Sequence, residues 1–245
     1  VEGFAAEIAE KLKKEDSEVM PAPVCCVKDE FEKAVKSFEN NGVDVIVTLH
    51  VAYSPSLESA SVLCSTDLPV IVMDTTPDYV FDENSGADAV LHNHGIHGVQ
   101  DLCNLLKRGG KAFEIFAGHY AESDICKKVA DTARVLCAAK SLKNAKVGII
   151  GKRFEGMGDF LADTAALNKL GIQIITANEK ELEACAALVT EAEIKAEYQR
   201  DKAFCDMNGI TFDDYAKTER VALTVRKWIT DKNLDAFTMN FQSAG

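Results

Sequence analysis

Histidines are the residues of this chain whose spacing points most directly to chemistry. The stretch from Ala87 to Gly98 holds His92, His94 and His97, which are three of the five histidines in the chain. Imidazoles titrate near neutral pH, exchange hydrogen bonds with hydroxyl groups and bind metal ions. Three interpretations stay open here: contact with a polar ligand, an open zinc site with water as fourth ligand, or histidines that stabilise a turn.

Other polar and aromatic side chains come directly after predicted strands. They are His50, Tyr53, Asp74 and His119. Because ligands bind beyond the carboxyl ends of parallel strands, we expect these side chains to converge with the histidine stretch. Tyr53 has two interpretations: its ring contacts a ligand, or it closes the end of the sheet as an aromatic plug.

The elements that must position these residues follow from the alternation of apolar runs and helical stripes. The predicted strands are 43–49, 69–73, 87–91, 111–116, 146–151, 172–176 and 236–241, with an edge or irregular strand at 18–27. The run at 43–49 is apolar enough to be buried on both faces of a sheet. The predicted helices are 1–14, 29–41, 56–65, 98–107, 123–140, a helix up to 170, 180–189, 191–206 and 212–232.

This alternation predicts an α/β fold with parallel sheets and right-handed crossovers. We predict two consecutive Rossmann-like or flavodoxin-like units with helices on both faces, an N-terminal one at 1–143 and a central one at 144–245. Doubly wound units usually begin on a strand, whereas Val1 lies inside a helical pattern and Gly245 directly follows an apolar strand. We therefore expect a fragment of a longer polypeptide that lacks its first strand and is cut at its C-terminal end.

Composition narrows the classes of partner. The net charge of -12 argues against nucleic acid and against anionic membranes, which both need clustered Lys and Arg. Apolar runs stay well below the roughly 20 residues of a membrane span. The 8 cysteines form no CxxC pair, which favours reduced thiols in a cytosolic protein. Gly151, Gly156 and Gly158 do not form a GxGxxG motif, so a dinucleotide site is poorly supported.

Several stretches occur in an order that is typical of one family. Ala89 to Gly98 is similar to an Asn-x-x-x-His-Gly turn, and Thr48 to Pro55 to a strand that ends in His-Thr-Phe-Ser-Pro. Ala117 to Tyr120 is similar to a Gly-His-Trp/Tyr segment before a long helix. The segments 146–160 and 235–241 resemble two strands of a central domain. In this order the chain resembles the N-terminal and central domains of the L-arabinose isomerase and L-fucose isomerase superfamily.

The resemblance implies a metal-dependent aldose–ketose isomerase, an intramolecular oxidoreductase that acts on a free sugar through a cis-enediol. In that family Mn²⁺ polarises two sugar oxygens while carboxylates move a proton. The family's catalytic and metal-binding residues follow the strand that corresponds to 235–241, so we expect them beyond residue 245 and none within this chain. The chain alone is then inactive. The resemblance further implies a cytoplasmic homo-oligomer, a trimer or a hexamer.

For this chain the resemblance implies a set of sugar-binding residues. Tyr53 matches the aromatic contact, and His97 matches the histidine near the sugar. His94 stands where arabinose isomerases have Gln, which leaves the identity of the sugar open. Phe154 or Met157 matches the methionine that touches the sugar. The alternative from another class is a non-catalytic sugar-binding or sensor module of flavodoxin-like or periplasmic-binding-like fold.

Overall fold

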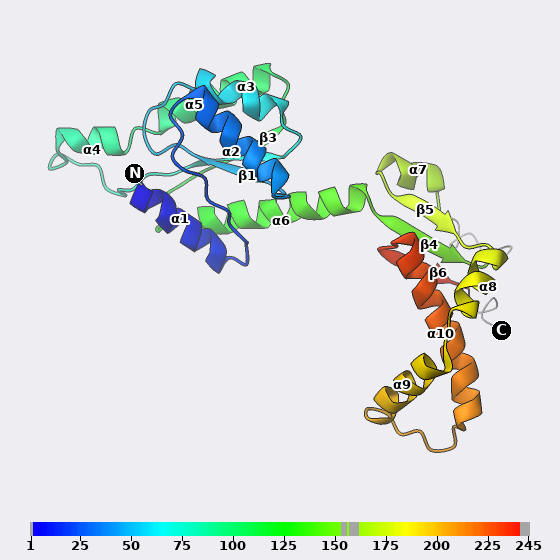
Figure 1. The fold of residues 1–245 in the computed structure, drawn as a ribbon. Coiled ribbons are helices and arrows are strands. Elements are labelled where there is room, and N and C mark those ends of the chain that lie inside the picture. Colours follow the sequence, from blue (N-terminus) through cyan, green and yellow to red (C-terminus); the bar gives the residue numbers. More distant parts are fainter. Residues whose placement is uncertain (1, 153–155, 157–161, 241–245) are drawn as a thin grey trace. The chain divides into compact units, whose positions relative to one another are not determined.

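The computed structural model describes residues 2–152, 156 and 162–240. The chain forms two units, Val1–Lys140 and Ser141–Gly245 (Figure 1). Each unit contains a parallel three-stranded sheet flanked by helices. The predicted α/β class, with two consecutive Rossmann-like or flavodoxin-like units, is therefore confirmed.

The sheet of the first unit has its strands in the order β1-β2-β3. These strands are β1 (Ile46–Leu49), β2 (Val70–Asp74) and β3 (Phe113–Ala117). The helices of this unit are α1 (Glu2–Lys14), α2 (Lys28–Asn40), α3 (Leu57–Ser65), α4 (Ala87–His92), α5 (Ile96–Arg108) and α6 (Ile125–Lys143). Helix α3 lies between β1 and β2 in sequence, and α5 between β2 and β3, so both connections run in the same direction across the sheet. Right-handed crossovers place such helices on the same face.

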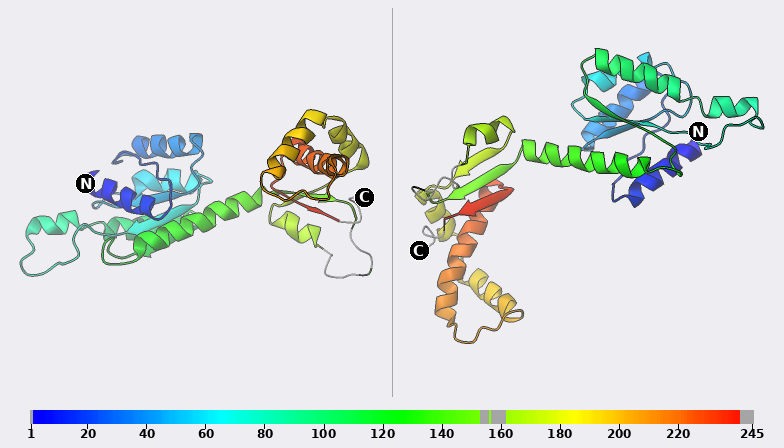
Figure 2. Two further views of the ribbon diagram at one scale, coloured as in Figure 1. Left: turned by 90° about the horizontal axis from the view of Figure 1, so that it is seen from below. Right: turned by 180° about the vertical axis from the view of Figure 1, so that it is seen from behind.

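Two apolar layers hold the sheet of the first unit. On one face, α2, α3 and α5 pack against alternate residues of the strands, including Val70 and Val72. On the other face, α1 and α6 pack against Ile71 and Met73. Figure 2 shows the same sheet between these helices from two further directions. The central strand β2 is buried on both faces because it lies between two strands and two helix layers.

The prediction that the strand at 43–49 is buried on both faces is wrong. Strand β1 begins at Ile46, and after this buried residue its side chains are half-buried. Its position at the edge of the sheet explains the difference, because one long side of the strand has no neighbouring strand in the part of the chain that the structure describes. A continuous apolar run does not distinguish an edge strand from a central one.

The prediction of a strand at 87–91 is also wrong, because this segment is helix α4. The neighbours of β2 in the sheet are β1 and β3, so the chain leaves the sheet after β2 and returns through α5. Away from a sheet, Ala and Leu favour a helix. Gly86 begins this helix, Asn93 ends it, and Val90 and Leu91 remain 44% and 67% exposed.

The segment 18–27 contains no strand either. Pro21 and Pro23 have no N–H groups to donate to a neighbouring strand, which agrees with an irregular course. Its backbone instead meets the first turn of α2, where a carboxylate oxygen of Glu30 accepts hydrogen bonds from the N–H groups of Cys26 and Val27, at 2.7 and 3.2 Å. These bonds lower the pKa of Glu30.

The sheet of the second unit has its strands in the order β5-β4-β6. They are β4 (Lys146–Ile150), β5 (Gln173–Thr176) and β6 (Ala236–Met239). The helices are α7 (Thr164–Lys169), α8 (Glu179–Ala187), α9 (Glu191–Lys202) and α10 (Phe212–Lys232). Trp228 on α10 is completely buried and packs with Ile150, Cys185 and Val225. Among the described residues, each helix is too short or too polar to cross a membrane.

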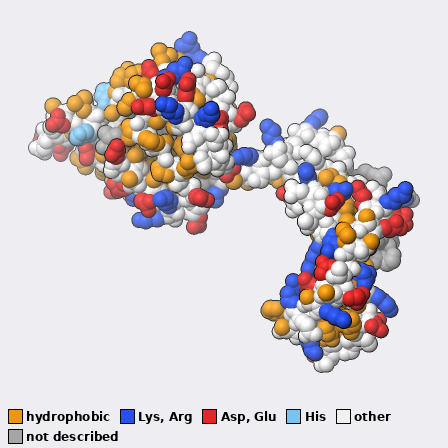
Figure 3. Space-filling view, viewed as in Figure 1, with side chains coloured by type: hydrophobic (Ala, Val, Ile, Leu, Met, Phe, Trp, Pro, Cys, Tyr) orange, Lys and Arg blue, Asp and Glu red, His pale blue; other side chains and the backbone are white. Residues whose placement is uncertain are grey.

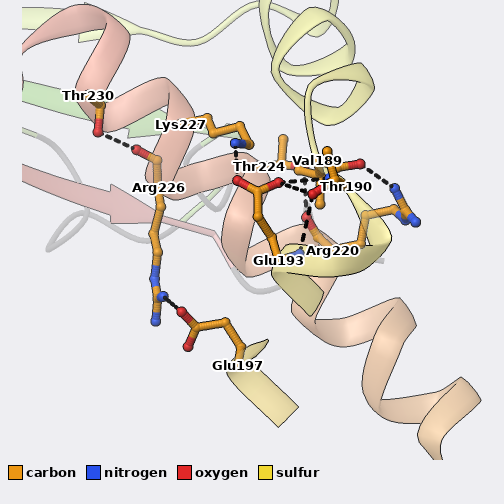
Figure 4. A network of polar contacts seen from close by, with 9 residues as sticks. All are labelled: Val189, Thr190, Glu193, Glu197, Arg220, Thr224, Arg226, Lys227 and Thr230. Carbon is orange, nitrogen blue, oxygen red and sulfur yellow. Dashed lines mark hydrogen bonds and ion pairs between the residues drawn. The ribbon is translucent and has the colours of Figure 1, made fainter. Parts of the chain in front are cut away.

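Polar contacts align α9 with α10 (Figure 4). Lys227 donates to Glu193 at 2.6 Å, and Arg226 lies 3.2 Å from Glu197. The hydrogen bond from Lys227, with those from Thr190, lowers the pKa of Glu193 to about 2. Ion pairs near the surface contribute little free energy. The apolar residues Val189, Ile194 and Leu223 hold them together.

The first prediction tests the buried central strand. We expect Ile71→Ala to lower the free energy of unfolding by about 3 kcal/mol, because it leaves a cavity at a fully buried position. Ile115→Ala on β3 is the matched control, since Ile115 is 47% exposed. Urea denaturation followed by circular dichroism measures both variants. Equal losses for Ile71→Ala and Ile115→Ala would contradict the two-layer core.

Candidate functional site

Most of the predicted site residues lie at the carboxyl edge of the first sheet. His50 directly follows β1, Asp74 ends β2, and His119 lies two residues after the end of β3. Strand register aligns the three ends, since Leu49 pairs with Met73 and Asp74 pairs with Ala117. Histidine side chains reach the surface near α4 at this end of the unit (Figure 3).

Tyr53, His94 and His97 form one group of rings. The rings of Tyr53 and His94 meet edge to face, with centroids 6.0 Å apart. The imidazoles of His94 and His97 stack at 4.6 Å with an angle of 25° between their planes. Tyr53 is 60% exposed, His97 is exposed and His94 is half-buried, so a ligand in solvent has access to the group.

His50 lies beneath the turn that carries this ring group. An ideal Cβ on Gly95 would lie 2.5 Å from the backbone oxygen of His50, and one on Gly98 would lie 2.7 Å from His50 Cδ2. These distances explain why glycine occupies both positions, because any other side chain would overlap His50. Ser56 secures the same region by donating its hydroxyl to the carbonyl of Gly98 at 3.1 Å.

His119 organises a second group at the end of β3. Its Nδ1 accepts hydrogen bonds from the backbone N–H groups of Ala121 and Glu122, both at 3.2 Å. With Nδ1 as acceptor, the neutral ring carries its proton on Nε2, which lies 3.4 Å from the carbonyl oxygen of Pro77. The ring also meets Tyr79 at 5.2 Å. Its hydrogen bonds give His119 a positioning role within the edge.

A reciprocal pair of hydrogen bonds anchors the excursion between β2 and α5. Asn93 donates its Nδ2 to Asp78 Oδ2 at 2.8 Å, and the N–H of Asp78 donates to Asn93 Oδ1 at 3.1 Å. Asn93 Nδ2 also donates to the carbonyl of Ala89 at 2.8 Å, which closes the end of α4. The pair therefore fixes the residue that directly precedes His94.

Asp74 is a half-buried carboxyl at the end of the central strand. Burial raises the pKa of Asp74, and burial together with Asp74 raises the pKa of Cys103 on α5. Burial also lowers the pKa of His50. Each shift favours the neutral form, because charge is poorly solvated there. The edge thus presents hydrogen-bonding groups and aromatic rings, which suit a neutral ligand with several hydroxyl groups.

The described residues do not offer a ligand set for a metal ion. Residues 2–152, 156 and 162–240 contain no group of three or more His, Cys, Asp or Glu side chains arranged to hold one. His92 ends α4, while His94 and His97 stack on each other. The open zinc site considered for these histidines is therefore not formed, and we derive no step through Zn²⁺ or Mn²⁺ for this part of the chain.

Phe154 and Met157, the remaining predicted sugar contacts, lie outside the described residues. Both residues follow β4 in the sequence. In the order β5-β4-β6, the neighbours β5 and β6 lie on opposite sides of β4, so the carboxyl end of β4 is a topological switch point. Ligands favour such switch points. Asn240 after β6 donates to the carbonyl of Lys152 there, at 2.5 Å.

A groove in the second unit has different chemistry. It lies between α10 and β6, and its apolar lining includes Val221, Val225, Ile229, Phe237 and Met239. Lys217 and Arg226 at its rim already lie near Asp214 and Glu197, at 4.0 and 3.2 Å. A ligand rich in hydroxyl groups would leave its polar atoms unpaired against this apolar lining. The edge of the first sheet is the better candidate.

Thr75, Asp78 and Tyr79 also contribute to the edge, although they were not among the predicted site residues. The Oγ1 atom of Thr75 accepts a hydrogen bond from the N–H of Tyr120 at 3.0 Å, which links the ends of β2 and β3. The run from Thr75 to Asp78 follows a strand and has the Thr, Pro and Asp composition of a turn. That signal indicates a loop, but it does not reveal the distant partner Asn93.

No known family model matches the chain, and no curated protein matches it.

The second prediction tests the anchor of the excursion. We expect Asn93→Ala to speed amide hydrogen exchange between residues 76 and 92, because each lost hydrogen bond is worth about 1 kcal/mol. Asn84→Ala is the matched control, since Asn84 lies in the same excursion and its Nδ2 is 3.5 Å from Asp82. Hydrogen exchange with mass spectrometry measures both. Unchanged exchange in Asn93→Ala would show that the pair does not anchor the segment.

The third prediction concerns Asp74 and pH. Its pKa in the folded chain lies above the ordinary value of 3.8, so the folded state favours the protonated carboxyl. The protonated carboxyl of Asp74 therefore stabilises the folded state at a pH below its pKa in the unfolded chain. This stabilisation is lost as the pH rises through its pKa in the folded chain. We expect Asp74→Asn to reduce this loss, as measured by urea midpoints between pH 4 and pH 7. Asp101→Asn, at an exposed position of α5, should leave the pH profile unchanged.

Proposed function

We propose that this chain is part of a metal-dependent aldose–ketose isomerase of the L-fucose or L-arabinose type. In this proposal the carboxyl edge of the first sheet contacts the sugar. The residues that bind Mn²⁺ and the carboxylates that move the proton lie outside the described residues in this proposal. The proposal rests on the resemblance of motif order and on one observation about the edge.

That observation is the contact between Tyr53, His94 and His97. These are three of the positions that the resemblance assigns to the sugar, and the ring of His94 lies 6.0 Å from that of Tyr53 and 4.6 Å from that of His97. Tyr53 follows β1, whereas His94 precedes α5 and His97 lies in its first turn, so the rings come from segments far apart in sequence. The contact supports a shared ligand, because independent structural roles give no reason for the three rings to meet.

The chemistry of these side chains fits a sugar. Neutral imidazoles donate and accept hydrogen bonds, as sugar hydroxyls do. The exposed ring of Tyr53 offers an apolar face to the carbon side of a sugar ring. In this proposal the chain binds and orients the sugar, and the proton transfer between its carbon atoms takes place on residues elsewhere.

We further propose a cytoplasmic homo-oligomer, a trimer or a hexamer, as the working form. Free thiols support a reducing compartment. They are Cys25, Cys26, Cys64, Cys103, Cys126, Cys185 and Cys205. An oligomer would complete the site if a neighbouring copy supplied the metal ligands.

The fourth prediction tests the sugar contact. We expect L-fucose or L-arabinose to shift the histidine ring signals of His94 and His97 in NMR spectra of the chain. His94→Ala should abolish the shifts at His97, because it removes the stacked partner and one hydrogen-bonding group. His92→Ala is the matched control and should bind normally, since His92 is exposed at the end of α4.

Activity separates the remaining outcomes. The chain with Mn²⁺ should form no ketose, and ketose formation would show that the metal ligands lie within it. Sugar binding by a longer form that never isomerises the sugar would instead support the non-catalytic binding module. The absence of ring shifts with either sugar would contradict the proposed function.

A further inference from the structure

His50 is a half-buried histidine to which the proposed function gives no role. Its Nδ1 atom is shielded from solvent and has no hydrogen-bond partner among the described residues. The Oγ1 atom of Thr48, two residues earlier, is in the same state. An unpaired buried polar atom destabilises the folded state, so the presence of His50 at this position needs an explanation.

The explanation lies in the fit between His50 and the turn above it. The Cβ positions of Gly95 and Gly98 would fall 2.5 and 2.7 Å from atoms of His50, so backbone and imidazole are in direct contact. Gly95 follows His94, and Gly98 follows His97. The backbone of His50 thus limits the approach at Gly95, and its ring limits the approach at Gly98.

Protonation of His50 would disturb this fit. The ring lies at the first turn of α5, where free N–H groups make the positive end of the helix dipole. The neighbouring strand β2 carries Asp74, and α5 carries His97, Asp101, Cys103, Lys107 and Arg108. Burial raises the pKa of Asp74 and lowers the pKa of His50, so burial disfavours the charged form of both groups.

We propose that His50 is a positioning residue whose neutral imidazole holds His94 and His97 at the height needed for ligand contact. When His50 takes up a proton, the ring moves away from Gly98 and the turn loosens. The geometric part of this inference stands without a ligand. The part about binding rests on the proposed function.

A double-mutant cycle tests the geometric part. In the chain with His50, Gly98→Ala forces Cβ against Cδ2, and such overpacking should raise the unfolding equilibrium constant roughly tenfold. In the His50→Ala background the opposing atom is gone, so Gly98→Ala should be neutral or stabilising, because Ala favours a helix. Gly3→Ala on α1, where a Cβ meets open space, is the control and should behave alike in both backgrounds. Equal effects of Gly98→Ala in both would overturn the inference.

The pH profile of L-fucose binding, measured by the ring signals of His94 and His97, tests the positioning role. Affinity should fall as His50 protonates, in a step that a non-titrating His50→Gln variant lacks. His50→Gln should bind severalfold more weakly at neutral pH, because Gln fills the space less well. An unchanged step in His50→Gln would overturn the inference. If the effects of His50→Ala and Gly98→Ala are coupled but no sugar binds, the proposed function is contradicted and the geometric part of the inference is retained.

Discussion

The contact between the end of β1 and the first turn of α5 is the constraint on which the candidate site depends. His50 fills the space that side chains at positions 95 and 98 would need. The turn can lie so close to the sheet only because both positions are glycine. This close approach brings His94 and His97 toward Tyr53, which follows the same strand as His50. Without it, the three rings would have no common anchor.

The surrounding structure keeps this contact in register. The buried strand β2 aligns the ends of its two neighbours, and the paired side chains of Asp78 and Asn93 tie the long excursion to the turn. Burial holds Asp74 and His50 toward their neutral forms, as their pKa shifts indicate. The edge thus combines a buried strand with hydrogen-bonding groups and aromatic rings. This combination suits recognition of a polyhydroxy compound.

The sequence predicted the fold well because period and apolar content report burial directly. The helices at 2–14, 28–40 and 212–232 and the strands at 70–74 and 146–150 lie close to their predicted bounds. The strand prediction for 87–91 failed because this segment does not join the sheet, and its place in the fold favoured a helix. The convergence on the sheet edge followed from topology, since strand ends meet there. The fit of Gly95 and Gly98 on His50 could not be predicted, because it depends on distances between segments remote in sequence.

The proposed function depends on the binding of a sugar at the carboxyl edge of the first sheet. Intermolecular nuclear Overhauser effects between L-fucose and the chain test it most directly. The account predicts effects between sugar protons and the ring protons of Tyr53 and His97. Effects confined to Val225, Ile229 and Phe237, in the groove of the second unit, would contradict it.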